Sequence, residues 1–143
     1  MKKILFLTVF IFVLLNNIYA LDRYNFTGIW KCKSTINSID DAYIAITQIN
    51  TSEYFIIFIN PFWDHQLDYS EYGILIENNY ISIHSKEHMF FIEITQLGSL
   101  YHYWNSLDDP YPSRFEKISD IELSANILNN NIDYLLLLFK SLE

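Results

Sequence analysis

Cysteine, glycine and basic residues are scarce in this chain of 143 residues, and each scarcity excludes something. A single cysteine, Cys32, excludes an internal disulfide, and its place in the first expected strand is typical of a small buried side chain. The three glycines, Gly28, Gly73 and Gly98, lie too far apart to build a glycine-rich loop for phosphate groups. No Gly-x-Ser-x-Gly nucleophile motif is present either.

The scarcity of positive charge bears on partners. Lysine and arginine number 9 against 17 acidic residues, and the formal net charge is −8. Such a chain is repelled by phosphate backbones and by anionic lipid surfaces. We therefore expect no nucleic-acid partner and no stable attachment to a membrane.

The side chains that serve catalysis and metal binding show no pattern of a known site. None of the four histidines, His65, His84, His88 and His102, has a partner at the spacing of a zinc motif. Acidic pairs such as 40–41 fall in polar segments, where solvation accounts for them. The sequence thus predicts no catalysis, no metal and no cofactor.

The N-terminus has the three-part layout of a secretory signal peptide. Lys2 and Lys3 precede an apolar run over 4–15, and Ala20 offers a small residue for cleavage after a polar break. The run falls short of the roughly 20 residues of a membrane-spanning helix, which is the alternative interpretation. We expect residues 1–20 to be removed and 21–143 to form a single exported domain, periplasmic or secreted. The loss of two lysines would bring the net charge to −10.

Segments rich in Ile, Phe, Tyr and Thr predict an all-β domain. Short polar connections separate them, and none is long enough for a crossover helix, so neighbouring strands should pair antiparallel. A meander of this kind favours an up-and-down barrel, with a sandwich as the alternative. The predicted strands span 28–35, 42–49, 54–59, 71–77, 80–84, 88–96, 100–104 and 113–118.

The tail predicts a helix over about 119–141. Ser119 and Glu122 fit a capping box, and apolar residues recur beyond them at three- and four-residue steps. Three asparagines at 129–131 are poor helix formers and leave room for a break. The strand 54–59 is apolar on both faces, so one face needs a cover. We expect the tail helix to supply it from outside the sheet.

Gly28-x-Trp30 at the start of the first strand, the meander and the helix after the last strand together resemble the lipocalins. The closest resemblance is to small lipocalin-like (calycin-type) barrels of bacterial exported proteins, and the excess of Ile, Asn and Tyr fits a bacterial source. The resemblance implies that Trp30 closes one end of the barrel beneath a basic side chain of the last strand. Arg114 is the expected partner, with Lys117 as the alternative. The lipocalin Thr-Asp-Tyr signature is absent, and 97–99 stand in its place.

The leading functional interpretation is a binding protein for a small apolar or amphipathic molecule. Four strand residues are expected to line the barrel, and three belong to a long loop predicted over 60–70. The candidate ligand-binding residues are Phe55, Trp63, His65, Tyr69, Phe90, Ile92 and Tyr103.

The alternative is a protein-interaction module, an inhibitor or an envelope partner, with a filled barrel and binding loops at 60–70 and 107–112. The aromatic strand 100–104 leaves both functions open. Tyr101 and Tyr103 would line a pocket if they point inward, or form a stripe for a protein partner if they point outward.

Overall fold

The structure is a computed structural model of the chain. It describes residues 25–33, 42–60, 66–77, 79–84, 89–104, 108, 112–128 and 132–143, without the side chains of 60 and 66–69. The predicted signal peptide therefore lies outside the described residues.

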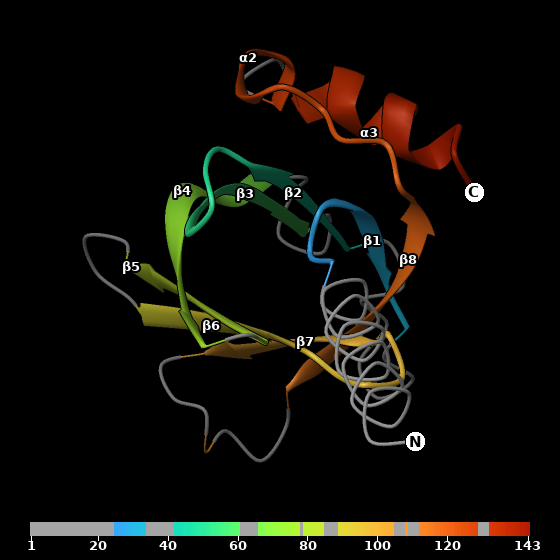
Figure 1. Ribbon diagram of the computed structural model, residues 1–143. Helices are drawn as coiled ribbons and strands as arrows, with labels where there is room; N and C mark the ends of the chain where they lie inside the picture. The colour runs from blue at the N-terminus through green and yellow to red at the C-terminus, as the bar shows by residue number, and fades with distance from the viewer. Residues whose placement is uncertain are drawn as a thin grey trace, which may run out of the picture.

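Eight antiparallel strands form a closed barrel in which each strand pairs with its neighbours in sequence and β1 pairs with β8 (Figure 1). The prediction of an up-and-down barrel is confirmed. The strands are β1 Gly28–Cys32, β2 Tyr43–Gln48, β3 Glu53–Asn60, β4 Gln66–Glu77, β5 Tyr80–His84, β6 Met89–Ile94, β7 Leu100–Trp104 and β8 Ser113–Ser119.

β4 begins earlier than predicted, so the prediction of a loop over 60–70 is wrong for most of that range. β4 pairs along the whole of β3, from Glu53↔Ile74 to Asn60↔Gln66, with a bulge between Phe58 and Ile59. The backbone groups of a buried strand need hydrogen-bond partners, and the early part of β4 supplies them for the second half of β3. Only 61–65 separate the two strands, and they lie outside the described residues.

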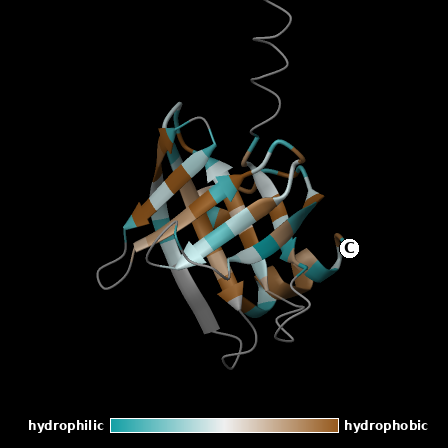
Figure 2. Ribbon diagram, turned by 90° about the horizontal axis from the view of Figure 1, so that it is seen from below, coloured by the Kyte–Doolittle hydropathy of each residue, from teal (hydrophilic) through white to brown (hydrophobic). Residues whose placement is uncertain are grey.

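Side chains alternate between the interior and the outside of the barrel, as the period of a strand requires, and in β6 every second residue is buried. Hydrophobic and hydrophilic residues accordingly form bands along the strands (Figure 2). Ile81, Ile83, Phe90 and Ile92 are buried in the interior cluster, as their spacing predicts. The interior cluster is Phe26, Trp30, Cys32, Ala42, Ile44, Ile46, Tyr54, Ile56, Phe58, Ile81, Ile83, Phe90, Ile92, Ile94, Leu100 and Phe115.

The tail forms two short helices, α2 Ala125–Leu128 and α3 Ile132–Lys140, so the predicted start at residue 119 is wrong. Ser119 ends β8, and its Oγ accepts a hydrogen bond from the N–H of Ile121 in a local turn, at 3.1 Å. The carboxylate of Glu122 accepts the N–H of Gln48 at 2.8 Å. Both polar groups thus serve the connection from barrel to tail. The asparagines 129–131 lie outside the described residues.

The tail helices cover the outer face of β1, β2 and β3 (Figure 1), which confirms the predicted cover. Leu128, Leu135 and Phe139 are buried there, and the Phe139 ring lies 5.6 Å from that of Tyr43. Each such side chain contributes roughly 1.5–3 kcal/mol of apolar burial. The barrel residues beneath the tail are Ile29, Tyr43, Ala45, Phe55, Ile57 and Ile59.

The end of the chain is fixed to the first strand by polar contacts. Lys31 Nζ lies 2.7 Å from a carboxylate oxygen of Glu143, and the Tyr43 hydroxyl donates to the other oxygen. The hydrogen bond to Lys31, followed by that from Tyr43, lowers the pKa of Glu143.

Candidate functional site

The stretch around Gly28 and Trp30 begins β1 and brings Phe26 and Trp30 into the interior cluster. Gly28 has φ +116°, and a Cβ on it would lie 2.4 Å from the carbonyl oxygen of Ser119 in β8. Glycine is therefore required where β1 begins beside the end of β8. Trp30 is buried, and its Nε1–H donates to the carbonyl of Phe26 at 2.9 Å.

The cation over Trp30 is Lys117, whose Nζ lies 4.9 Å from the ring centroid. Lys117 is the register partner of Trp30 across β1 and β8, which brings the two side chains together. Arg114 lies opposite Tyr101 in the pairing of β7 with β8. Its guanidinium donates to the Ser99 hydroxyl at 3.2 Å and to the Glu116 carboxylate at 3.3 Å. The prediction of Arg114 as the cation over Trp30 is therefore wrong, and the alternative, Lys117, is confirmed.

Two of the four predicted lining residues face the interior and two do not. Phe90 and Ile92 are buried in the interior cluster. Phe55 packs on the outside beneath the tail. Tyr103 also faces outward, because its neighbour His102 occupies the inward position. The prediction that Phe55 and Tyr103 line the interior is therefore wrong.

Aromatic rings meet across the barrel interior. Phe58 on β3 and His102 on β7 have ring centroids 4.9 Å apart, although four strand steps separate β3 from β7 in a barrel of eight. Phe90 stacks on the same histidine at 5.7 Å, and Phe115 lies 6.0 Å from Phe58. Side chains thus fill the interior at this level, as they do in many small barrels.

The predicted loop residues are not brought into a site by the described part of the chain. Trp63 and His65 lie outside the described residues. Tyr69 lies in β4 opposite Phe58, and its side chain is not described. Their assignment to ligand binding stays a prediction.

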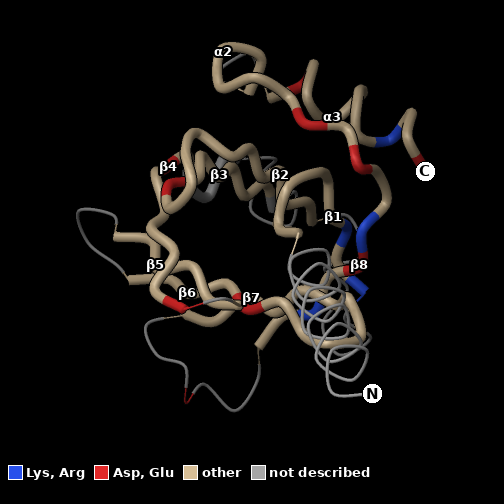
Figure 3. The backbone as a smooth tube through the Cα atoms, viewed as in Figure 1, with Lys and Arg blue, Asp and Glu red and all other residues tan. Residues whose placement is uncertain are grey.

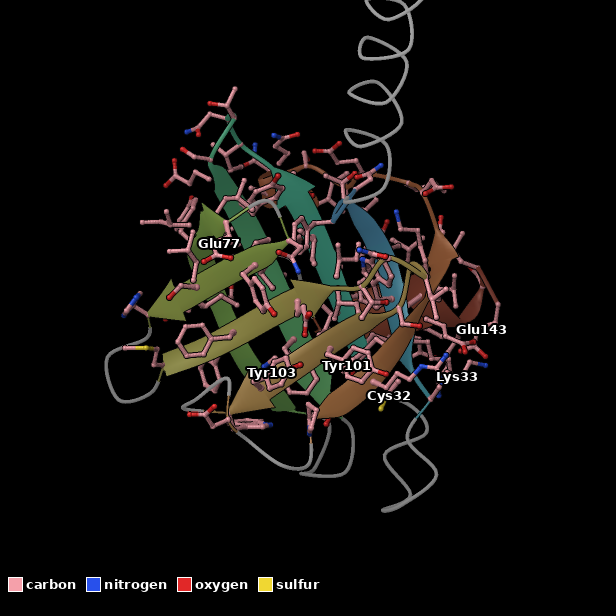
Figure 4. The ribbon with its side chains drawn as sticks, turned by 60° about the horizontal axis from the view of Figure 1, so that its bottom comes forward. Cys32, Lys33, Glu77, Tyr101, Tyr103 and Glu143 are labelled. Carbon is pink, nitrogen blue, oxygen red and sulfur yellow. The ribbon has the colours of Figure 1, made fainter. Side chains whose placement is uncertain are left out.

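The outer face of β4 to β7 carries aromatic and apolar side chains that no described helix covers. Tyr72, Ile74 and Ile76 on β4 are 53%, 57% and 54% exposed. Figure 4 shows Tyr101 and Tyr103 side by side on β7, on the same side of the barrel as Glu77. We call this surface the open face, and it comprises Tyr72, Ile74, Ile76, Glu77, Tyr80, Ser82, His84, Met89, Phe91, Glu93, Tyr101 and Tyr103.

A carboxylate held by two phenols lies in the middle of the open face. Tyr80 donates its hydroxyl to one oxygen of Glu93 at 3.0 Å, and Tyr103 donates to the other at 2.6 Å. Burial, then the hydrogen bond to this carboxylate, raises the pKa of Tyr103 far above its ordinary value. The pKa of Tyr80 is raised for the same reasons, with Glu77 adding to the effect. Both phenols therefore remain neutral donors at ordinary pH.

Charge is distributed unevenly around the barrel (Figure 3). The described lysines and arginines lie on or next to β1 and β8 or at the end of α3, and β2 to β7 carry none. Acidic side chains are present on these strands, with Glu77 and Glu93 on the open face. The open face is thus apolar, aromatic and acidic.

The sequence indicated this surface only in part, through the alternative that Tyr101 and Tyr103 point outward and form a stripe for a protein partner. It named Tyr101 and Tyr103 but not the partners Tyr80 and Glu93. The sequence of β4 could have indicated it, because Tyr72, Ile74 and Ile76 place a large apolar or aromatic residue at every second position. Large apolar side chains at the outward positions of a strand indicate a second buried or binding surface.

The fold defines a class: a closed, eight-stranded, antiparallel up-and-down barrel with short tail helices, lipocalin-like in general shape. The chain matches no protein-family model, no curated protein and no solved structure. Within the described ranges, no three His, Cys, Asp or Glu side chains are grouped to hold a metal ion. No helix among those same residues has the length and apolar character to cross a bilayer.

Proposed function

We propose that this protein is an exported protein-interaction module, a lipocalin-like barrel with a filled interior that binds a protein partner through its open face. The observation that carries the proposal is the exposure of Tyr72, Ile74 and Ile76 on β4, each more than half exposed and next to one another on one face. Contiguous exposed apolar surface of this kind marks binding sites on soluble proteins.

The composition of the open face supports a protein partner. Tyrosine and methionine are enriched in the buried cores of protein interfaces, and tyrosine dominates their energetic hot spots. Five of its members are aromatic: Tyr72, Tyr80, Phe91, Tyr101 and Tyr103. The barrel residues of the opposite outer face that lie beneath the protein's own helices, on β1 to β3, are all hydrophobic. The barrel thus has two apolar outer faces, of which the tail occupies one.

The barrel interior offers less support for the small-molecule interpretation. The contact between Phe58 and His102 fills the axis at their level, and Gly73 is enclosed by Ile56 and Ile81, whose atoms would lie 2.6 and 2.5 Å from a Cβ. A ligand inside the barrel would need to displace these packed side chains. Binding of a small apolar molecule stays a prediction. We carry forward the protein-interaction alternative, but with its contacts on the open face instead of the loops 60–70 and 107–112.

Export, a bacterial source and descent from the lipocalin-like barrels belong to the same proposal. The basic start, apolar run and small residue at Ala20 support export to the periplasm or beyond. Gly28, Trp30 and a cation over the tryptophan support the lipocalin likeness. The absence of enzyme activity stays a prediction from the sequence.

A matched pair of photocrosslinking variants tests the proposal. Tyr72 on the open face and Tyr134 on α3 are both 53% exposed, so each is replaced in turn by the photoactivatable p-benzoylphenylalanine. Irradiation of cells producing each variant should link one defined polypeptide to position 72 and not to position 134. The same products at both positions, or no product at 72, would contradict the proposal. Native mass spectrometry of the purified protein tests the small-molecule alternative in parallel.

A further inference from the structure

The geometry of the Glu93 carboxylate identifies the chemistry of the partner, provided that the open face is the binding surface proposed above. Glu93 lies between Tyr80 on β5 and Tyr101 on β7 in the register of the barrel. Each of its oxygens accepts one phenol hydrogen, from Tyr80 and from Tyr103. A carboxylate oxygen has two lone pairs, so each oxygen keeps a position for a second donor. The hydrogen bonds from the two phenols fix the orientation of the group.

An oriented carboxylate among aromatic rings suits a guanidinium group. Arginine presents two parallel N–H donors that match a carboxylate, and its planar surface stacks on aromatic rings. Tyr80, Tyr101 and Tyr103 stand around Glu93 on neighbouring strands and supply such rings. A lysine ammonium would pair with the charge but would not use the fork geometry or stack in the same way.

The distribution of charge favours a basic partner independently. From Lys33 to Arg114 the sequence contains one intervening basic residue, Lys86, and the described parts of β2 to β7 contain none. Glu77 adds a second carboxylate to the open face. Complementary charge of this kind raises association rates and selects partners. It also excludes acidic partners from the face.

We propose that the open face binds a protein segment that places an arginine on Glu93 and flanking apolar side chains on Tyr72, Ile74 and Ile76. The arginine supplies orientation and selectivity, and the apolar stripe of β4 supplies contact area. A second copy of the chain is a poorer occupant, because the copy would bring its own acidic face and few basic groups to the contact.

Two short peptides serve as probes. Each is acetylated and amidated and has leucines on both sides of a central residue, which is arginine in one and its neutral isostere citrulline in the other. The tyrosine rings of the full mature protein are labelled with ¹³C, and their NMR signals are followed during titration. The arginine peptide should shift the signals of Tyr80 and Tyr103 in a saturable way, at least roughly fivefold more tightly than the citrulline peptide.

A pair of charge-matched variants completes the test. Glu93→Gln removes the carboxylate and keeps its size, while Glu116→Gln removes the same charge on β8, where Glu116 pairs with Arg114. Binding of the arginine peptide should be lost in Glu93→Gln and kept in Glu116→Gln. Equal binding of the two peptides, no saturable shift, or an equal effect of the two variants would overturn the inference. A shift of the same signals with protein concentration alone would assign the face to a second copy and would also overturn it.

The two proposals fail separately. If position 72 crosslinks a defined polypeptide whose capture is unchanged in Glu93→Gln, the open face is an interface and the arginine assignment is wrong. If position 72 captures nothing and the arginine peptide does not bind, both proposals are wrong.

Discussion

The sharpest test of the contact between β1 and β8 is replacement of Gly28 by alanine. Two effects act on the folded state. The φ of +116° places an L-residue in a strained region, and the new Cβ would lie 2.4 Å from the carbonyl oxygen of Ser119. An ordinary carbon–oxygen contact is about 3.3 Å or more, so the strands must separate by roughly 1 Å or the turn must distort. Because the obstacle is backbone rather than a flexible side chain, local relaxation relieves little of the clash.

Gly98 provides the matched control. Its φ is +78°, also in the left-handed region, but a Cβ there meets nothing within 4 Å. Gly98→Ala therefore costs about 1–2 kcal/mol of conformational strain, offset by about 0.4–1 kcal/mol from the reduced freedom of the unfolded chain. Gly28→Ala carries the same two effects and an overpacking cost of about 1–3 kcal/mol.

The difference between the two variants combines the close approach of β1 to β8 with the greater departure of Gly28, at φ +116°, from the left-handed region that an L-residue tolerates. Urea denaturation followed by tryptophan fluorescence should give a free energy of unfolding about 1–3 kcal/mol lower for Gly28→Ala than for Gly98→Ala. Equal stabilities would refute the argument, because they would mean that β1 and β8 do not approach as closely as the structure shows. A Gly28→Ala variant that does not fold, together with a Gly98→Ala variant that does, would agree with the expected order of stability.

Two further predictions concern the tail. Phe139→Ala, at a fully buried position, should lower the free energy of unfolding by about 3–5 kcal/mol, whereas Leu137→Ala, 71% exposed on the same helix, should change it by less than about 0.5 kcal/mol in urea denaturation. Similar losses for both would contradict the packing of α3 on the barrel. Because its pKa is lowered in the folded protein, Glu143 stabilises the fold above its ordinary pKa of 4.5, and this contribution is lost as pH falls through the lowered value. Glu143→Gln should therefore reduce the loss of stability between pH 5 and more acidic values in thermal unfolding, and an unchanged pH profile would contradict the contact with Lys31.

The barrel could be predicted from the sequence because its information is local. Period-two alternation decides which residues face inward, and short polar connections allow only antiparallel neighbours. Phe90 and Ile92 were placed correctly in the interior on these grounds. The two-sided apolar character of 54–59 also required a cover, and the tail provides it.

The predictions that were wrong, for Phe55 and Arg114, depend on the register between neighbouring strands and on competition between possible partners. Phe55 and its neighbour Ile56 are equally apolar, so alternation alone does not say which of them faces inward. Arg114 and Lys117 differ by three residues, and the bulge between Ile29 and Trp30 contributes to the register that brings Lys117 to Trp30. Neither choice is visible in a single strand, because each is settled by the strand next to it.

The candidate site was harder to predict because its residues form no sequence motif. Tyr80, Glu93 and Tyr103 come from three strands, and only the closed barrel makes them neighbours. Polar and aromatic residues at outward strand positions have solvent exposure as their ordinary explanation. The contacts that distinguish this cluster require three-dimensional structure.

The pairing of β1 with β8 has a consequence for how the protein is made. Every other pair of strands forms a hairpin between neighbours in the chain, whose short loops close at little entropic cost. β1 is synthesised first, yet one of its edges has no partner until β8 exists, at the far end of the chain. Until then that edge presents unpaired backbone groups, which other chains can join. The growing chain therefore remains prone to aggregation until the last strand and the tail have formed. β8 then pairs with the open edge of β1 and closes the barrel, and the tail covers the first three strands.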